Sequence, residues 1–557
     1  MPAKKQNPIR KDPHDSEAFG LKGRIVTMKS EKDIIESGIV YIKDSLIVAV
    51  VKSGEPVPAA CKNFPVLQTG GTIFPGMIEL HNHLSYNCLP LWPVPAKFEN
   101  RDQWSRLDLY KNLISGPMNI LGKTPGYVEA IVRYVECKCL VAGVTTSQGI
   151  MLASNGGIRT FYRGIVRNVE SPDDPNLPKV DGHIPDIAAR DAGHFFNHLK
   201  KTSCLLLHLS EGTNASAYKH FEDLRINEEE WAITDALTGI HCVALKSADF
   251  KRLKKKGASI VWSPLSNLML YGATANVKAA RASGIKIGIG SDWSPSGSKN
   301  LLGELKVARL FSQQNGNIFS DFELISMATM QAARIIKWDK QIGSIEKGKL
   351  ADLVVFDSKT GNPFQKFFDA TEKNISLVLI NGEARFGSQK LMKKLGGKTE
   401  TVNIGKLSRS LNLHQESGNE VVGKLLLSEA ASKLKKGLAD LKKLSRKMPA
   451  LKAMEGPDNS KIMVPDSGTN HNGTEKKSFV LVLDHDGEEG EEIRRNPMAG
   501  PDMRELLKTV AAEIPPIQLD PLCVVNDKKY FKNLQSSPNL PDYIKTGLKK
   551  MYKGFDF

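Results

Sequence analysis

The chain has 557 residues, of which 41% are hydrophobic and 25% are charged. This length predicts one large domain with additions, because single cores rarely grow beyond about 250–300 residues, and the lack of an apolar run of about 18 residues excludes a membrane-spanning helix. The formal net charge of +16 would suit nucleic acid or an anionic surface, but no aromatic-interleaved basic patch accompanies it, so we expect no nucleic-acid partner.

The N-terminal residues and the cysteines indicate a cellular compartment. Met1–Lys5 lacks the apolar core of a secretory signal peptide. The seven cysteines contain no CxxC pair and are scattered through apparent strands and helices, which favours reduced thiols. We therefore expect a cytoplasmic protein, and a homo-oligomer is left open.

The first part of the chain predicts a tail followed by a small sheet. Residues 1–18 are polar, basic and proline-bearing, which is typical of a disordered tail. In residues 19–72, short alternating runs at Arg24–Met28, Gly38–Ile42 and Leu46–Val51 are separated by polar and glycine-containing segments. The pattern predicts antiparallel strands that form the N-terminal part of a β-sandwich.

A short apolar strand within Phe74–His83 ends in two histidines, His81 and His83. Because side chains alternate along a strand, both imidazoles point to one face, about 7 Å apart at the backbone. Glu79 shares this face, either as a support for the histidines or as a buried structural carboxylate. The pair can converge on one metal ion, which requires further ligands.

A long insertion rich in aromatic residues and prolines follows, from Leu84 to Lys123. Long irregular segments after a strand that carries chemistry are often lids or pocket walls. The alternative is a packed surface loop. Tyr86 and Trp92 are the residues of this segment that we select as candidates for lining a substrate pocket.

Strand-like and helical segments alternate over residues 73–342, which predicts an α/β fold built on a TIM-like (β/α) barrel. The strand-like runs after the opening strand are Val144–Ile150, Ile158–Val169, Cys204–Leu209, Thr238–Ala244, Ala258–Trp262 and Ile285–Ser291. The helical stretches include Tyr127–Leu140, Ile187–Lys200, Ala248–Lys256, Val277–Ser283 and Leu301–Phe311. Seven strands result; an eighth is hidden between Val169 and Cys204, or the barrel is irregular.

His208, His241 and Asp292 each lie at the end of one of these strand-like runs. In parallel α/β barrels the side chains that carry chemistry lie at the carboxyl ends of strands. We therefore expect these residues to meet His81 and His83 at one metal site. Glu170 also ends a strand-like run and could bridge a second ion, which leaves the number of metal ions open.

The chain after the predicted barrel divides into three parts. Residues 343–392 contain strand-like runs that predict the C-terminal part of the β-sandwich. Residues 393–477 predict a basic amphipathic helix and a linker that begins near residue 453. The apolar stripe of the helix, Leu434, Leu438, Leu441 and Met448, could bind a membrane or an acidic partner, but we favour docking on the protein itself. Residues 478–557 predict a small C-terminal extension, with a strand near Phe479–Leu483 and helices at Pro501–Ala512 and Leu540–Tyr552.

An ordered set of motifs resembles the amidohydrolase superfamily, and within it the branch of cytosine deaminase and chlorohydrolases. The motifs are Pro75–His83, His208–Glu211, Ser263–Asn267, Gly290–Asp292 and Gly343–Phe356. The resemblance covers about residues 20–390. It implies a barrel that carries a metal-dependent hydrolase site.

The resemblance implies a role for each matching residue. His81, His83, His208 and Asp292 would hold one divalent ion, zinc first and iron second, which lowers the pKa of bound water from 15.7 toward ~7 and supplies hydroxide. The implied catalytic residues are Asp292, which would also accept the proton of water, His241, which would orient the hydroxide and the developing oxyanion or ligate the ion, and Glu211, which would shuttle a proton to a ring nitrogen or a leaving amine.

Two features depart from the family pattern. No lysine ends a fourth strand, since Lys200 and Lys201 precede a strand, so the bridging lysine of two-metal relatives is not evident. Trp293 follows Asp292 where relatives often have glycine. This bulkier residue suggests a different pocket wall, so Trp293 is a candidate for lining the pocket. Asn267 of the Ser263–Asn267 motif is a further candidate.

The sequence thus predicts a hydrolase that acts on a non-peptide carbon–nitrogen bond of a small nitrogen-containing molecule. One form is a deaminase of a heterocyclic amine, and an alternative is ring opening of a cyclic amide, as in imidazolonepropionase-like relatives. A barrel that has lost catalysis and serves as a binding scaffold is the alternative from a different class.

Overall fold

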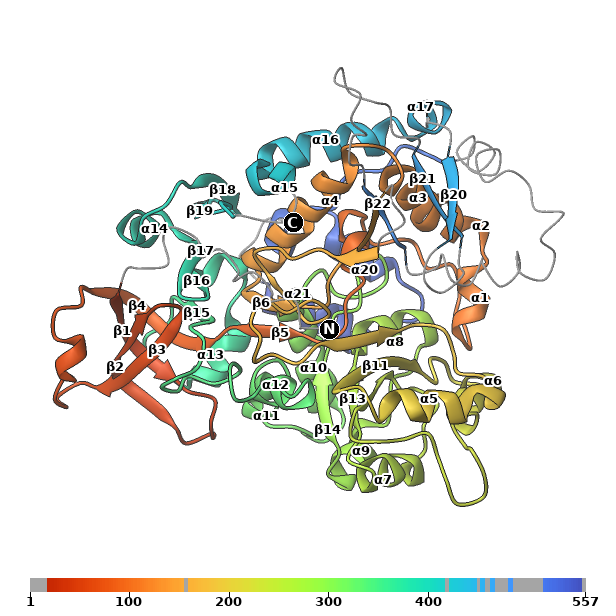
Figure 1. Ribbon diagram of the computed structural model, residues 1–557, viewed down its shortest axis with the longest axis horizontal. Helices are drawn as coiled ribbons and strands as arrows, with labels where there is room; N and C mark the ends of the chain where they lie inside the picture. Colours follow the sequence, from red (N-terminus) through yellow and green to blue (C-terminus); the bar gives the residue numbers. More distant parts are fainter. Residues whose placement is uncertain are drawn as a thin grey trace, which may run out of the picture.

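The computed structural model describes residues 18–154, 159–415, 420–447, 451–455, 461–465, 479–483 and 514–552 (Figure 1). Residues 1–17 of the predicted tail, much of the predicted linker at 453–477 and the predicted helix Pro501–Ala512 lie outside these residues. The described residues form a mixed α/β fold, which confirms the fold class expected from the alternating pattern.

Parallel strands form two sheets that carry the candidate site. The strands are β5 (Met77–Glu79), β6 (Val144–Ser147), β9 (Arg167–Asn168), β10 (Val180–His183), β11 (Cys204–Leu209), β12 (Leu237–His241), β13 (Ser259–Trp262) and β14 (Lys286–Ile289). The order is β5-β6-β9 in one sheet and β10-β11-β12-β13-β14 in the other. Every residue of β11 and β12 is buried, as expected for parallel strands covered on both faces.

Backbone contacts join these two sheets at both ends. Val180 N donates to Val169 O at 3.0 Å, next to β9 and β10. Asn82 and Asp292 form a parallel bridge just beyond the ends of β5 and β14. β10 is the strand that stayed hidden in the sequence, because it is only four residues long and follows a proline-rich stretch.

The predicted run Ile158–Val169 is not one strand. Its first part is β8 (Arg159–Phe161), which pairs antiparallel with β7 (Met151–Ser154), and only its end is the parallel strand β9. At Gly164, between them, an added Cβ would lie only 2.0 Å from Glu136 Oε1, so this position has no room for a side chain.

Helices lie next to the parallel strands in the sequence, with α4 before β6 and the others after β10. These helices are α4 (Tyr127–Val141), α5 (Ala192–Leu199), α6 (Ala215–Glu222), α7 (Ser247–Lys255), α8 (Pro264–Tyr271), α9 (Val277–Ser283), α10 (Leu301–Gln314), α11 (Asp321–Met327) and α12 (Met330–Ile335). Local signals in the sequence set their ends. Asn300 caps α10 by accepting from Gly303 N, and Gly284 ends α9 in the left-handed conformation.

Strands from both flanks of the parallel core form one nine-stranded sheet, in the order β18-β19-β17-β16-β15-β4-β1-β2-β3. Their bounds are β1 (Phe19–Val26), β2 (Ile34–Lys43), β3 (Leu46–Lys52), β4 (Val66–Pro75), β15 (Leu353–Phe356), β16 (Ile375–Ile380), β17 (Glu383–Ser388), β18 (Glu400–Ile404) and β19 (Leu407–Leu411). We expected these flanking strands to end by residue 392 and a helix and linker to follow. The structure instead extends the sheet with β18 and β19, whose short polar alternation is hidden by the basic composition around it.

Short helices make up the insertion and the later part of the chain. The insertion holds α1 (Arg101–Ser105), α2 (Asp108–Tyr110) and α3 (Gly116–Gly122) with short helical turns at Leu84–Cys88 and Lys111–Ser115. After β15 come α13 (Pro363–Asp369), α14 (Gln389–Leu395), α15 (Glu420–Lys424), α16 (Leu427–Ala439), α17 (Leu441–Arg446), β20 (Leu451–Glu455), β21 (Lys461–Pro465), β22 (Phe479–Leu481), α20 (Tyr530–Ser536) and α21 (Asp542–Met551). β22 pairs antiparallel with β7, so the C-terminal extension shares a sheet with strands that follow β6.

The predicted basic amphipathic stretch docks on the protein itself. Leu434 and Leu438 of α16 and Leu441 of α17 are buried in the main core. Figure 1 shows α16 lying along α4, and the two helices are in contact. Lys433 lies over the Tyr127 ring, 5.3 Å from its centroid. The apolar stripe is therefore covered by this chain and not left for a membrane or an acidic partner.

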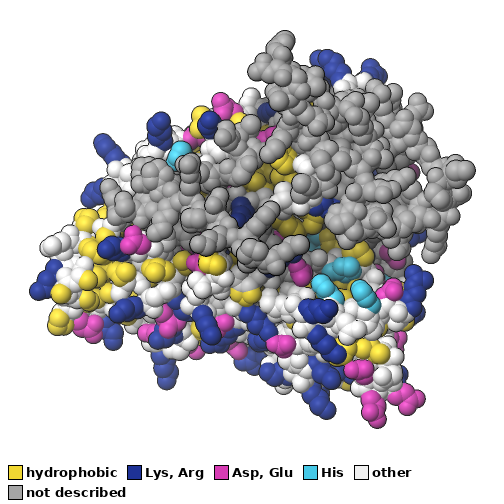
Figure 2. Space-filling view, in the orientation of Figure 1, with side chains coloured by type: hydrophobic (Ala, Val, Ile, Leu, Met, Phe, Trp, Pro, Cys, Tyr) yellow, Lys and Arg dark blue, Asp and Glu magenta, His cyan; other side chains and the backbone are white. Residues whose placement is uncertain are grey.

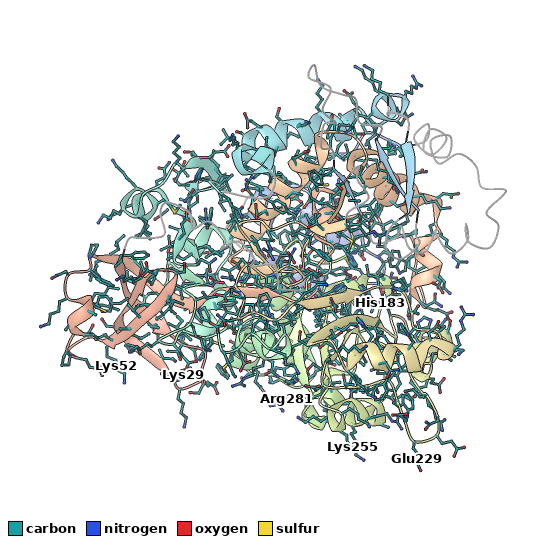
Figure 3. The ribbon with its side chains drawn as sticks, in the orientation of Figure 1. Lys29, Lys52, His183, Glu229, Lys255 and Arg281 are labelled. Carbon is teal, nitrogen blue, oxygen red and sulfur yellow. The ribbon has the colours of Figure 1, made fainter. Side chains whose placement is uncertain are left out.

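The surface carries mixed charge. Figure 2 shows basic side chains spread over the visible face among acidic ones, and Lys29, Lys52 and Lys255 point outward at the rim in Figure 3. The helices within the described ranges include none long and apolar enough to cross a bilayer. All seven cysteines are described, and each is buried as a free thiol.

Arg167 joins the parallel strands to the nine-stranded sheet. Its guanidinium is buried and donates to both carboxylate oxygens of Asp352, the residue before β15, at 3.1 Å from Nη2. The same group also pairs with Asp173 and donates to Asn381 Oδ1 at 2.6 Å. A buried charge with several partners fixes how the two sheets meet.

We expect Arg167→Met to lower the free energy of unfolding by about 3–5 kcal/mol, because Asp352 would remain buried without its partner. Arg281→Met is the matched control: Arg281 pairs with Glu323 on the surface (Figure 3), with half of its side chain exposed, and its loss should change stability by less than about 1 kcal/mol. Urea denaturation followed by fluorescence measures both. Equal losses in the two variants would contradict the role given to Arg167.

Candidate metal centre

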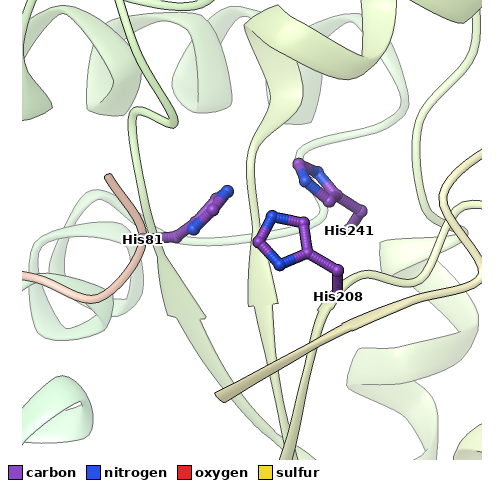
Figure 4. A group of neighbouring side chains, drawn as sticks. All are labelled: His81, His208 and His241. Carbon is purple, nitrogen blue, oxygen red and sulfur yellow. The ribbon is translucent and has the colours of Figure 1, made fainter. Parts of the chain in front are cut away.

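Four histidines and an aspartate meet at the carboxyl ends of the parallel strands. His81 and His83 follow β5, His208 lies near the end of β11, His241 ends β12 and Asp292 follows β14. Figure 4 shows the rings of His81, His208 and His241 turned toward a common space. Their positions at the carboxyl ends of predicted parallel strands led us to expect these five residues at one site, and the structure brings all of them together.

The distances between these groups are those of ligands that share an ion. The ring centroids of His208 and His83 lie 4.7 Å and 4.9 Å from that of His81. Asp292 Oδ1 lies 3.1 Å from His81 Nε2 and 3.4 Å from His83 Nε2. Two ligand atoms on a tetrahedral zinc ion, with bonds of ~2.0 Å, would lie about 3.3 Å apart.

Burial puts the ligands in the protonation state that metal binding requires. Desolvation lowers the pKa of His81, and it lowers the pKa of His208 further because the neighbouring histidines oppose a second positive charge. Burial alone would raise the pKa of Asp292, but the histidines outweigh it and hold that pKa below its usual range. Neutral imidazoles and an ionised carboxylate are the ligand forms of these side chains.

Hydrogen bonds fix the tautomer of His81. Gln148 Oε1 accepts from the backbone N–H of Asn82 at 3.0 Å, so this atom is an acceptor, and it lies 3.2 Å from His81 Nδ1. His81 therefore carries its proton on Nδ1 and presents a lone pair on Nε2. That lone pair lies 3.1 Å from Asp292 Oδ1, an arrangement that a shared cation would stabilise.

A second chain of hydrogen bonds fixes the opposite tautomer in His241. Trp262 Nε1, which can only donate, bonds to Thr274 Oγ1 at 2.7 Å, and Thr274 then donates to Asn267 Oδ1 at 3.2 Å. The Asn267 amide nitrogen therefore donates to His241 Nδ1 at 3.0 Å. The proton of the neutral His241 ring sits on Nε2, which favours a role as hydrogen-bond donor over ligation.

The described residues contain two groups that could hold a metal ion: His81 with His208 and His241, and His81 with His83 and Asp292. His208 Nδ1 is buried and finds no hydrogen-bond partner among the residues that the structure describes, and a metal ion would satisfy this nitrogen. Nitrogen and oxygen donors of this kind suit zinc. The residues present therefore fit a divalent metal ion.

The backbone is held in an uncommon conformation at two of these positions. His241 has φ 66° and Asp292 has φ 65°, both in the left-handed region that non-glycine residues rarely adopt. Two hydrogen bonds hold Asp292 there: its N–H donates to His81 O at 3.0 Å, and its carbonyl accepts from His83 N at 2.7 Å. Local strain of this kind is typical of functional sites.

Glu211 and Tyr271 form a buried polar pair beside His241. Glu211 Oε2 lies 3.8 Å from His241 Nε2, and Tyr271 donates to Glu211 Oε1 at 2.7 Å. Trp104 of the insertion donates to Tyr271 Oη at 2.9 Å. Burial raises the pKa of Glu211, and the nearby Arg101 only partly offsets this. Burial thus favours the protonated form of this carboxyl group more than in an exposed glutamate.

Aromatic rings surround Trp293 next to the metal ligands. Its ring centroid lies 5.5 Å from that of His83 and 5.1 Å from that of Tyr86. Trp104 and Tyr110 of the insertion lie 6.1 Å and 6.2 Å from Trp293. Trp92 packs one ring further out, against Tyr110. Tyr86, Trp104 and Tyr110 of the insertion therefore form, with Trp293, an aromatic wall next to the metal ligands. This agrees with the interpretation of the insertion as a wall of the site; that its residues line a substrate pocket stays a prediction.

Several of the predicted site residues contact the ligands or their neighbours but belong to neither metal-binding group. Asn267 orients His241, as described above. Glu79 accepts from Ser291 N and Oγ at 2.7 Å and 2.8 Å and so ties β5 to the end of β14. Glu170 accepts from Gly149 N at 2.6 Å and from Gln148 Nε2 at 3.4 Å, which places it behind Gln148 and outside both metal groups.

Sequence reasoning missed Gln148 and Tyr271. Gln148 follows β6 and occupies the same strand-end position as the histidines, so the strand-end rule could have found it. Tyr271 is the last residue of α8, and no local pattern marks it. Its role depends on the distant partners Glu211 and Trp104.

Comparison with known proteins places these residues in a family. The Amidohydrolase family matches residues 201–385. The 5-methylthioadenosine/S-adenosylhomocysteine deaminase of Thermoanaerobacter pseudethanolicus is 25% identical over 401 residues, covering 64% of this chain and 91% of that enzyme. Residues 201–385 therefore carry an amidohydrolase domain. This confirms the class predicted from the sequence, a hydrolase acting on non-peptide carbon–nitrogen bonds.

Solved structures of amidohydrolases share the fold. A triazine hydrolase from Arthobacter aurescens has a TM-score of 0.53 and 19% identity, with 66% of this chain and 94% of that chain covered. An adenosine deaminase from Xanthomonas campestris, solved with bound zinc, has a TM-score of 0.50 and 17% identity, with 67% and 94% covered. At these identities the likeness concerns the fold.

The geometry predicts that the purified amidohydrolase binds a divalent metal ion and that His208→Ala lowers its zinc affinity at least tenfold, because a buried ligand is lost. His183→Ala is the control, since His183 ends the neighbouring strand β10 but lies outside both metal groups. Metal analysis and competition with a chromophoric chelator measure the affinity. Unchanged zinc affinity in His208→Ala would contradict the assignment.

Proposed function

We propose that this amidohydrolase is a zinc-dependent deaminase that removes the amino group of a heteroaromatic ring. The observation that carries the proposal is the pair formed by Glu211 and His241 beside the ligand cluster: a carboxyl group able to hold a proton and an imidazole N–H, 3.8 Å apart. Relatives named as deaminases of 5-methylthioadenosine and S-adenosylhomocysteine, matched over most of their length, support the reaction class.

The proposed ligands are His81, His83, His208 and Asp292. When bound, a zinc ion supplies Lewis-acid chemistry and lowers the pKa of water to near neutrality. His81 and His208 are buried and neutral, so they need no proton release before binding. His83 is partly exposed, at 14% of its side chain, which leaves the open side of the cluster at this residue.

The protein's own groups move the protons. Asp292 is ionised beside the histidines and accepts the proton of the attacking water. The Nε2–H of His241 donates a hydrogen bond to the oxygen that gains charge as water adds to the ring carbon. Glu211, whose pKa is raised by burial, donates its proton to the ring nitrogen. Asp292 then passes the proton taken from water to the amino group, which departs as ammonia, and Glu211 takes back a proton from the hydroxyl group that becomes the carbonyl. Tyr271 keeps the Glu211 carboxyl group in place.

The aromatic wall supports a flat substrate. The Trp293 ring lies beside His83, and the rings of Tyr86 and Trp104 lie 5.1 Å and 6.1 Å from it. Aromatic rings of this kind pack against a planar heterocycle in offset or edge-on geometry. Trp293 replaces the glycine that relatives often carry, so the wall narrows the site next to Asp292. We also propose that the two parallel sheets, linked at Val180 and at Asp292, form one closed barrel.

The proposal predicts ammonia release from 5′-methylthioadenosine, S-adenosylhomocysteine or adenosine by the zinc-loaded protein. Glu211→Gln should lower kcat about 10²–10⁴-fold because the proton donor is lost, while zinc content stays the same. Glu222→Gln, an exposed glutamate at the end of α6, is the control and should keep full activity.

A coupled assay for ammonia, run beside ring absorbance, measures the outcome. Loss of ring absorbance without ammonia would favour ring opening of a cyclic amide instead. Full turnover in Glu211→Gln would remove the proposed proton donor.

A further inference from the structure

Asp520, in the C-terminal extension, is buried next to the insertion. Only 1% of the surface of Asp520 is exposed to solvent. Its backbone N–H donates to Cys88 O at 2.9 Å, and its carbonyl accepts from Tyr134 Oη at 2.5 Å. Asp520, Cys88 and Tyr134 all lie outside the family match at residues 201–385. The extension therefore reaches into the body of the protein at one defined point.

The carboxylate of Asp520 lies between two buried lysines. Oδ2 accepts from Lys138 Nζ of α4 at 2.5 Å, and Oδ1 pairs with Lys299 Nζ. Lys299 also pairs with Asp527 at 2.9 Å. Both lysine side chains are 2% exposed. The two buried ammonium groups repel each other, and Asp520 is the carboxylate that contacts both.

The two lysines lead to the loop that carries Asp292, defined here as residues 292–299. Lys138 Nζ donates to Ser294 Oγ at 2.9 Å and to Asn87 O at 2.7 Å. The side chain of Asn87 accepts from Ser294 N at 2.7 Å. Lys299 is the last residue of the loop, directly before the cap of α10. Asp520 thus contacts the end of the Asp292 loop directly at Lys299 and reaches its first half at Ser294 through Lys138.

The same contacts continue to the metal ligands. The amide of Asn87 donates to Asn82 Oδ1 at 2.9 Å, and Asn82 lies between His81 and His83. Asn82 in turn donates to Ser291 Oγ at 3.2 Å, next to Asp292. An unbroken set of hydrogen bonds therefore runs from Asp520 through Lys138 and Asn87 to the residues on either side of the ligands.

We propose that Asp520 is a positioning residue of the metal centre, through which the C-terminal extension holds the Asp292 loop in its metal-binding geometry. The inference rests on the metal centre of the proposed function but on none of its substrate chemistry. Asp292 keeps a left-handed backbone at φ 65°, a conformation that persists only where surrounding structure holds it. The extension supplies part of that structure.

The test compares zinc affinity in full-length variants, without substrate, by competition with a chromophoric chelator. Asp520→Asn keeps the shape of the side chain but leaves the two lysines without their shared charge, and it should weaken zinc binding tenfold or more. Asp527→Asn is the matched control, because Asp527 lies on the same extension and pairs with Lys299. Its zinc affinity should stay within twofold of the wild-type value.

The cobalt-substituted protein gives a second readout that a purely structural role would not change. Its visible absorption reports the ligand arrangement, so it should shift in Asp520→Asn and stay the same in Asp527→Asn. If Asp520→Asn does not fold, Ser294→Ala takes its place, since it leaves the buried charges untouched and removes only the bond at the loop. It should weaken zinc binding threefold or more.

Wild-type zinc affinity and an unchanged cobalt spectrum in a folded Asp520→Asn, or wild-type affinity in Ser294→Ala where that variant is needed, would overturn the proposal. Equal losses of affinity in Asp520→Asn and Asp527→Asn would do the same, because they would show a general effect of the extension on stability. A protein that releases no ammonia but shows the predicted affinity pattern would contradict the deaminase function alone.

Discussion

The interaction on which this structure depends is the buried contact of the Asp292 carboxylate with His81 and His83. It joins the ends of β5 and β14 through side chains at 3.1 Å and 3.4 Å and through two backbone hydrogen bonds. A carboxylate buried this deeply is unfavourable unless positive charge faces it. Burial lowers the pKa of His81, so a bound cation would supply the positive charge that faces this carboxylate.

The hydrogen bonds around the cluster give each histidine a different task. Gln148 turns the lone pair of His81 toward Asp292, while the chain from Trp262 through Thr274 and Asn267 turns a proton of His241 toward Glu211. Each chain of hydrogen bonds begins at a group that can only donate, a backbone N–H in one case and an indole N–H in the other, and this group sets the direction of the hydrogen bonds that follow. One side of the site is therefore built of acceptors and the other of donors, which suits the addition of water across a carbon–nitrogen bond.

Much of the site could be predicted because strand ends are local features. His81, His83, His208, His241 and Asp292 each end an apolar run, and parallel topology brings such ends together. The strand β10 escaped because it is four residues long. Asn267 was expected at the pocket wall, but the structure places it behind His241, since only the folded protein shows which partner its amide contacts. Asp520 was not predictable at all, because its partner Lys138 is 382 residues away in the sequence.

The central claim is that these side chains hold one metal ion at the carboxyl ends of the parallel strands. A crystal of the zinc-loaded protein, measured at the zinc absorption edge, tests it most directly. The account predicts one anomalous peak within bonding distance of His81, His83, His208 and Asp292, with the Nε2 of His241 turned toward it but not bonded. A peak elsewhere on the chain, or a cluster in which Asp292 has moved away from the histidines, would contradict the account.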